Sequence, residues 1–128
     1  MTLKHINDNY GHETGDLVLR AVAKKIQGCT REIDSLARLG GDEFGLLLLE
    51  MKDENGIIKV AQKILDRFSK GIVINKQKII LTLSIGISIY PGDGSKEQDL
   101  IRKADEAMYY VKKHGKNNYQ LFCQMEAG

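Results

Sequence analysis

Two adjacent glycines, Gly40 and Gly41, lie between two apolar segments and constrain the fold of this chain more than any other feature. Glycine reaches positive φ without steric cost, so a Gly-Gly pair between strand-like segments is typical of a tight β-hairpin turn. The next two residues, Asp42 and Glu43, add carboxylates, which are the ligands that hard divalent cations prefer. The pattern predicts a hairpin whose tip can hold a metal and a nucleotide; the alternative is a polar turn with solvated acids.

The composition indicates a single globular domain over residues 1–128, long enough to bury a core. The net charge of +2 is small and the basic residues are dispersed, which argues against a general nucleic-acid binder. No apolar stretch reaches the about 20 residues of a membrane span, and no signal peptide is visible. Cys29 and Cys123 lie far apart, so we expect a reduced, cytoplasmic protein without zinc.

Helical and strand-like segments alternate along the chain. Apolar residues recur at helical spacing in three long segments, the first of which has Leu17, Val18, Ala21, Val22 and Ile26 on one side. Between them are shorter β-like segments, two of which are joined by a turn at residues 75–77. The predicted helices cover residues 4–10, 13–29, 53–70 and 95–114, and the predicted strands cover residues 35–39, 43–50, 71–74, 78–90 and 119–122.

This order predicts an α+β sandwich, with helices on a mostly antiparallel sheet. A ferredoxin-like arrangement fits if one further strand precedes Lys4. Residues 46–49 are continuously apolar, so we expect that strand to be covered on both faces.

Five motifs in order resemble one known family, the GGDEF domains, which are the diguanylate cyclases of bacterial signalling. The hairpin sequence matches the signature from which the family takes its name. The other four motifs resemble the family's F-K-x-I-N-D-x-x-G-H-x-x-G-D, S-I-G-I-A, A-D-x-A-L-Y-x-A-K and G-R-N blocks. In this chain the five motifs are residues 3–16, 40–44, 84–88, 104–112 and 115–117.

The resemblance implies that two GTP molecules condense into cyclic di-GMP with loss of two pyrophosphates. It makes Asp42 a metal ligand and Glu43 a second metal ligand or catalytic carboxylate, with Mg²⁺ or Mn²⁺ as the ion. Such phosphoryl transfer needs cations to hold the triphosphate and to neutralise developing charge. Gly40 and Gly41 would let the nucleotide lie against the hairpin.

Further substrate contacts follow from the other motifs. Asn7 and Asp16 match residues expected to bind guanine, and an amide and a carboxylate suit its acceptor and donor groups. Lys112 and Lys116 match cations on the terminal phosphates, although Lys116 replaces the more usual Arg and loses its bidentate geometry. Without the motif, Lys112 would be assigned to a solvated helix face.

An R-x-x-D motif at Arg31 and Asp34 precedes the hairpin at the spacing of the family's inhibitory site, which binds cyclic di-GMP. Arg can bind a phosphate or a guanine edge with two donors, and Asp can accept guanine N–H bonds. Lys63, on the following helix, is a weaker candidate for a supporting cation. In isolation an R-x-x-D pair is more often a surface ion pair.

The chain departs from the family pattern at its N-terminus. Aligning Leu3 and Lys4 with the family's F-K places one expected metal-binding Asp before Met1, so we expect the family's first strand and the helix before it to lie outside this sequence, and this chain by itself to be weakly active or inactive. We expect a domain from a longer protein with a sensor or receiver domain N-terminal to it. Catalysis would require a homodimer, without nucleic acid or membrane insertion.

The missing Asp leaves a second function open, a non-catalytic module that binds GTP or cyclic di-GMP. A ferredoxin-like interaction or RNA-binding module ranks far lower, because the aromatic residues are few and scattered.

Overall fold

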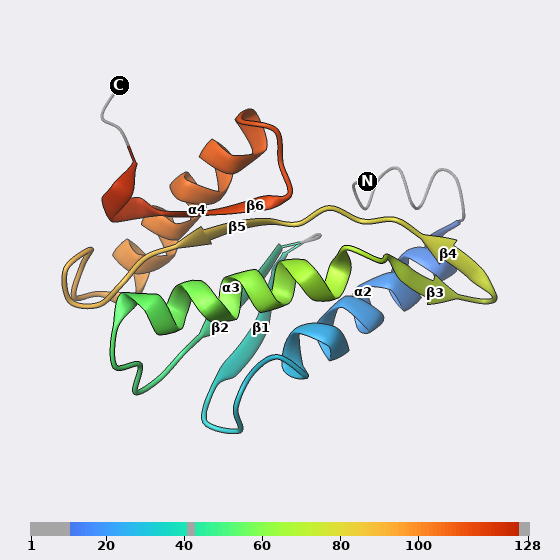
Figure 1. The fold of residues 1–128 in the computed structure, drawn as a ribbon, viewed down its shortest axis with the longest axis horizontal. Helices are drawn as coiled ribbons and strands as arrows, with labels where there is room; N and C mark the ends of the chain where they lie inside the picture. Colours follow the sequence, from blue (N-terminus) through green and yellow to red (C-terminus); the bar gives the residue numbers. More distant parts are fainter. Residues whose placement is uncertain (1–10, 41–42, 126–128) are drawn as a thin grey trace. The chain divides into compact units, whose positions relative to one another are not determined.

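The computed structural model describes residues 11–40 and 43–125, which divide into two compact units, residues 1–81 and 82–128 (Figure 1). The described part of the first unit contains two helices and two hairpins, and that of the second contains one long helix with two strands and a 3₁₀ turn. In the first unit the elements are α2 (His12–Gln27), β1 (Ser35–Gly40), β2 (Glu43–Leu47), α3 (Glu54–Phe68), β3 (Ile72–Ile74) and β4 (Gln77–Ile79). In the second they are β5 (Ser84–Ile87), α4 (Glu97–Lys113), β6 (Asn118–Leu121) and η1 (Phe122–Gln124).

The three long helices confirm the prediction from periodicity to within two residues at most boundaries. Helix α2 follows Gly11, whose φ of 91° favours glycine, and the acid in its first turn and the lysines in its last turn complement the helix dipole. Its buried side chains include Val18, Val22 and Ile26, whereas Leu17, expected on the same side, is 38% exposed. The predicted helix at residues 4–10 lies outside the described residues.

Helix α3 begins after Asp53, whose side chain accepts a hydrogen bond from Gly56 N at 2.9 Å, as an N-cap residue does. It buries Ala61, Ile64 and Phe68, which recur at helical spacing.

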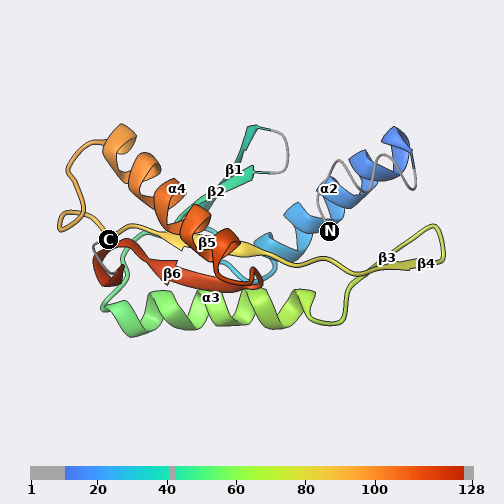
Figure 2. The same cartoon turned by 90° about the horizontal axis from the view of Figure 1, so that it is seen from above.

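The predicted hairpin at the Gly-Gly pair is confirmed. Strands β1 and β2 lie side by side and antiparallel, with Leu36 opposite Leu46 and Arg38 opposite Phe44 (Figures 1 and 2). Strand β2 ends at Leu47, three residues earlier than expected. Strands β3 and β4 form a second hairpin through a two-residue turn at Asn75 and Lys76, both at positive φ, and Gln77 belongs to β4 rather than to the turn.

The β-structure differs from the single, mostly antiparallel sheet expected from the sequence. Within the described residues there are three separate two-stranded sheets, and the β5–β6 pair is parallel. The segment predicted as one strand over residues 78–90 is divided, because residues 80–83 and 88–90 are not strand.

Residues 46–49 are not covered on both faces, since Leu47 is 56% exposed and Leu49 is 43% exposed. The reason is that the described part of the chain gives β2 only one strand partner, β1. A run of apolar residues indicates potential for burial, but a second neighbour is needed to realise it.

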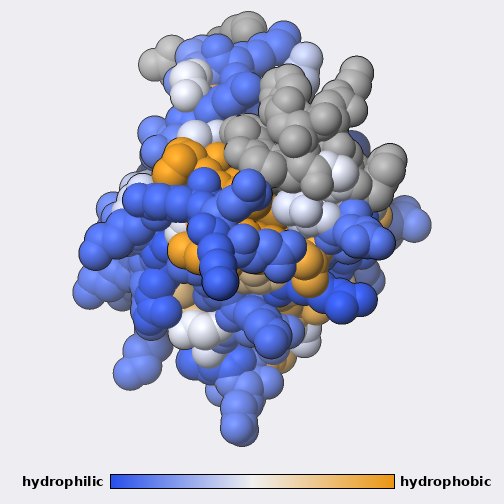
Figure 3. Space-filling view, turned by 90° about the vertical axis from the view of Figure 1, so that its right-hand side faces the viewer, coloured by the Kyte–Doolittle hydropathy of each residue, from blue (hydrophilic) through white to orange (hydrophobic). Residues whose placement is uncertain are grey.

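The exposed apolar side chains of the first unit are dispersed among polar ones. Val73 and Ile80, on and just after the β3–β4 hairpin, are 69% and 54% exposed. In the space-filling view of the side on which this hairpin lies, hydrophilic side chains cover most of the surface, with small apolar areas between them (Figure 3). No helix in the described ranges has the length and apolar character needed to cross a membrane.

The second unit is held together by α4, which packs against β5 and β6 (Figure 2). Ala107, Val111 and Leu121 are almost fully buried in this packing. Gly86 brings β5 against the helix backbone, because a Cβ at this position would collide with Ala104 O and Met108 N.

Helix α4 ends at Lys113, and Gly115 lies just past it at a φ of 103°. Lys116 N donates to Val111 O at 3.0 Å, which closes the helix in a Schellman-type turn.

Candidate functional site

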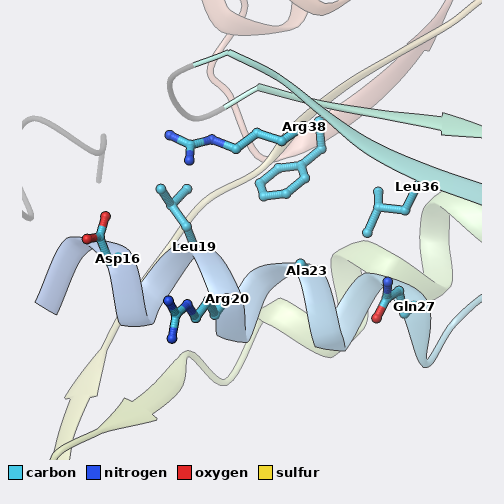
Figure 4. A pocket seen from close by; sticks show the side chains of 8 residues that line it. Asp16, Leu19, Arg20, Ala23, Gln27, Leu36 and Arg38 are labelled. Carbon is cyan, nitrogen blue, oxygen red and sulfur yellow. The ribbon is translucent and has the colours of Figure 1, made fainter. Parts of the chain in front are cut away.

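A groove lies between one face of α2 and the β1–β2 hairpin. The cavity has a volume of about 460 Å³, and its helix residues follow one another at intervals of one to four positions along one side of α2. Its lining consists of Asp16, Leu19, Arg20, Ala23 and Gln27 from α2, and Leu36, Arg38 and Phe44 from the hairpin (Figure 4).

The two ends of the groove differ in chemistry. Asp16 and Gln27 lie at opposite ends of the helix lining, and the Arg38 side chain extends from β1 over Leu19 (Figure 4). Leu19 lines the groove beside Asp16, so an apolar side chain lies next to this exposed carboxylate. An apolar wall beside a carboxylate suits a flat ring with N–H donors at its edge.

The tip of the hairpin is described up to Gly40 and from Glu43 onwards. Glu43 pairs with Gly40 across the turn and is half-buried at the start of β2. The predicted site residues Asn7, Gly41 and Asp42 lie outside the described residues. Across residues 11–40 and 43–125, no group of three or more His, Cys, Asp or Glu side chains gathers as a metal site would require.

The structure brings Arg31 and Asp34 together, as their spacing predicts. Arg31 Nη2 lies 3.0 Å from Asp34 Oδ1, and a second cavity of about 270 Å³ lies beside the pair. This cavity is lined by Gln27, Thr30, Arg31, Glu32, Asp34 and Leu36, and Lys63 on α3 is not among its lining residues. Gln27 and Leu36 line both cavities, so the two candidate sites are neighbours.

The ion pair between Arg31 and Asp34 shifts the pKa values of both side chains. The Arg31 side chain, by hydrogen bonding to the Asp34 carboxylate, holds the pKa of Asp34 below its ordinary value of 3.8, with backbone hydrogen bonds from Arg31 and Leu49 adding to the effect. The same hydrogen bond raises the pKa of Arg31. Both groups are therefore charged throughout the physiological range.

Lys112 and Lys116 belong to the second unit. Lys112 is exposed in the last turn of α4, and Lys116 follows the helix at a φ of 61°. Their approach to a nucleotide at the hairpin stays a prediction.

The sequence interpretation did not identify several lining residues of the groove, notably Leu19, Arg38 and Gln27. Helical spacing from Asp16 would have indicated Leu19 and Arg20 on the same side of α2. Arg38 would have followed from its cross-strand position opposite Phe44, but only once the hairpin register was known.

The comparison with protein families agrees with the motifs. The family model "Diguanylate cyclase, GGDEF domain" matches residues 1–118. This chain therefore belongs to the GGDEF family of diguanylate cyclase domains. It is 43% identical over 119 residues to the bifunctional diguanylate cyclase/cyclic di-GMP phosphodiesterase MucR of Pseudomonas aeruginosa, covering 93% of this chain and 17% of MucR.

Solved structures show the same α+β fold. The GGDEF domain of TpbB (also called YfiN) from P. aeruginosa matches with a TM-score of 0.90 at 35% identity, over 98% of this chain and 77% of that one. The GGDEF domain of DgcB from Caulobacter crescentus, solved in complex with c-di-GMP, matches with a TM-score of 0.80 at 26% identity, over 95% and 72% of the two chains. The chain spans about a third or less of the length of the curated relatives that it matches first.

Proposed function

We propose that this domain condenses two GTP molecules into cyclic di-GMP and two pyrophosphates. The observation that carries the proposal is the groove that joins Asp16 on α2 to the β1–β2 hairpin bearing the Gly-Gly-Asp-Glu sequence. One ligand can reach a base-binding carboxylate and the carboxylates of the hairpin tip only if these elements face a common cavity. The proposal includes the nucleotidyl-cyclase-like fold that the family resemblance implies.

Guanine would bind at the Asp16 end of the groove. Its N1–H and N2–H groups would donate to the Asp16 carboxylate, and the amide of Asn7 would pair with the remaining edge. Adenine lacks these donors, so the carboxylate would be left without partners and ATP would be rejected. The neighbouring Leu19 lines the same groove and would offer the ring an apolar contact.

A divalent cation would be held by Asp42 and Glu43. Glu43 stands at the start of β2, and carboxylate oxygens are the donors that Mg²⁺ and Mn²⁺ favour. Mg²⁺ commonly uses one or two carboxylates together with substrate phosphates, which fits a site with two adjacent acids. When bound, the ion would neutralise the phosphates and lower the pKa of the attacking hydroxyl.

The remaining substrate contacts belong to the same proposal. Gly40 and Gly41 would let the triphosphate approach the backbone, and Lys112 and Lys116 would bind its terminal phosphates. Two GTP-loaded domains would face each other as a homodimer, in the cytoplasm, within a longer protein whose N-terminal sensor or receiver domain controls their meeting. Cyclic di-GMP would inhibit the enzyme at Arg31 and Asp34, with Lys63 in support.

Product analysis tests the proposal. The chain and the longer protein proposed to contain it are incubated side by side with GTP and Mg²⁺ or Mn²⁺, and cyclic di-GMP and pyrophosphate are quantified, with an Asp42→Asn variant and an ATP reaction as controls. We expect the longer protein to form product from GTP but not from ATP, at a rate that rises more steeply than linearly with protein concentration, because two loaded domains must meet. We expect this chain by itself to form little or no product. GTP binding by the longer protein without product would favour the non-catalytic nucleotide-binding module.

A further inference from the structure

The Asp34 side chain is almost fully buried although it follows a surface turn. Only 2% of it is exposed, compared with 46% of the Arg31 side chain. Its two oxygens accept four hydrogen bonds from protein groups. Oδ2 accepts from Arg31 N at 2.8 Å and Arg31 Nε at 3.3 Å, and Oδ1 accepts from Arg31 Nη2 at 3.0 Å and Leu49 N at 3.3 Å.

Arg31 makes further contacts to the same distant segment. Its Nη2 atom donates to Leu49 O and lies 3.2 Å from Met51 Sδ. The pair therefore ties the turn after α2 to the backbone just beyond β2, which is 15 or more positions further along the chain. We call this set of bonds between Arg31, Asp34 and Leu49 the clasp.

The clasp conflicts with a simple docking of a nucleotide onto Asp34. An ionised carboxylate offers about four acceptor positions, and four protein donors occupy them here. A guanine edge that donates to Asp34 must therefore replace at least one of those donors. The Leu49 N–H and Arg31 Nε–H bonds are the two longest of the four, and Arg31, being half-exposed, can meet a ligand first.

We propose that the clasp opens when a guanine nucleotide binds to the R-x-x-D pair, and that the Leu49 amide is the protein donor that Asp34 gives up. This inference rests on the proposed binding of cyclic di-GMP at Arg31 and Asp34. Opening releases the backbone at Leu49, just beyond the end of β2, and it occurs beside Gln27 and Leu36, which also line the substrate groove. The inhibitory site would thus act on the hairpin through the bonds that it loses.

Amide hydrogen exchange at Leu49 tests the clasp without any ligand. In Asp34→Asn the charged acceptor is lost, so exchange at Leu49 is expected to accelerate about tenfold or more. Asp66→Asn, a change at an exposed position of α3, is the matched control and is expected to leave Leu49 unchanged. Unchanged exchange at Leu49 in Asp34→Asn would overturn the clasp, and circular dichroism of both variants confirms that they are folded.

The same measurement at saturating cyclic di-GMP tests the opening, with occupancy followed by calorimetry. We expect Leu49 exchange to accelerate in the wild-type chain as the ligand binds. Full occupancy with unchanged or slower exchange at Leu49 would show that the clasp stays closed and would overturn the proposal.

Absence of any binding would overturn ligand-driven opening together with the proposed inhibitory site. The ligand-free comparison would still decide whether the clasp exists, and the GTP product assay would separately decide the proposed catalytic function.

Discussion

Strands β2 and β5 are both apolar, but their surroundings are opposite. Strand β5 lies so close to α4 that Gly86 has no room for a Cβ, whereas β2 leaves Leu47 more than half exposed. Strand β2 carries the candidate catalytic Glu43 at its start and is followed by the clasp at Leu49. The difference indicates that β5 contributes packing to its unit, whereas β2 contributes a candidate catalytic side chain at its start and is followed by a hydrogen-bonded tie to Asp34.

Glu43→Gln provides the largest expected effect. Losing one carboxylate at the hairpin tip should lower cyclic di-GMP formation on the order of 100-fold or more, because the cation and the developing charge lose a ligand. The midpoint of thermal unfolding should hardly change. Glu97→Gln, in the first turn of α4, should change neither quantity. A large loss of stability in Glu43→Gln would contradict the division between the two strands.

Gly86→Ala and Gly45→Ala compare the two strands directly. At Gly86 the obstacle is helix backbone, so alanine should cost about 3 kcal/mol or more of unfolding free energy. At Gly45 a Cβ would lie 3.3 Å from Leu39 Cδ1, and Leu39 is 51% exposed, so its side chain can move and the cost should stay below about 1 kcal/mol. Urea unfolding measures both. Equal losses of unfolding free energy in the two variants would contradict the proposed difference in packing between β5 and β2.

Truncation of apolar side chains should again destabilise the packing around α4 more than it destabilises β2, with smaller losses of unfolding free energy. Val111→Ala removes two methyl groups from a site that is 3% exposed and should cost about 2 kcal/mol. Leu47→Ala should cost about 0.5 kcal/mol or less, because much of this side chain already contacts solvent. A cost at Leu47 as large as that at Val111 would indicate that β2 is covered in solution, for example by a second copy of the chain.

Acid should weaken the end of β2 through Asp34. Because the folded state lowers the pKa of this carboxyl, its stabilising contribution is complete above the ordinary value of 3.8 and is lost as the pH falls through the lower folded value. Thermal unfolding from neutral pH to about pH 2.5 should therefore show the wild type and Asp34→Asn converging at the acid end. A difference in unfolding temperature that stays constant across this range would mean that ionisation of Asp34 does not stabilise the clasp.

The sequence predicted local elements better than it predicted their neighbours. The helices at α2, α3 and α4 and the hairpin at Gly40 follow from periodicity, capping and glycine conformation, which are local properties. The parallel pairing of β5 with β6 and the exposure of Leu47 depend on which strands meet, which local pattern does not encode.

In the candidate site, too, local features could be predicted from the sequence, whereas contacts between distant segments could not. The Arg31–Asp34 contact was predictable from spacing, but the saturation of Asp34 depends on an amide at Leu49, 15 positions away. Similarly, Asp16 was identified from its motif, whereas the place of Arg38 in the groove required the hairpin register. Residues Asn7, Gly41 and Asp42 stay predictions.

The closing turn of α4 has a consequence for the two lysines proposed to bind phosphate. Lys112 lies in the last helical turn, and the backbone N–H of Lys116 donates a hydrogen bond to Val111 O in that turn, with only residues 113–115 between the two lysines. Their backbone positions are therefore coupled. A movement of α4 would carry both positive charges together, so the contributions of the two lysines to the proposed phosphate binding would rise or fall jointly.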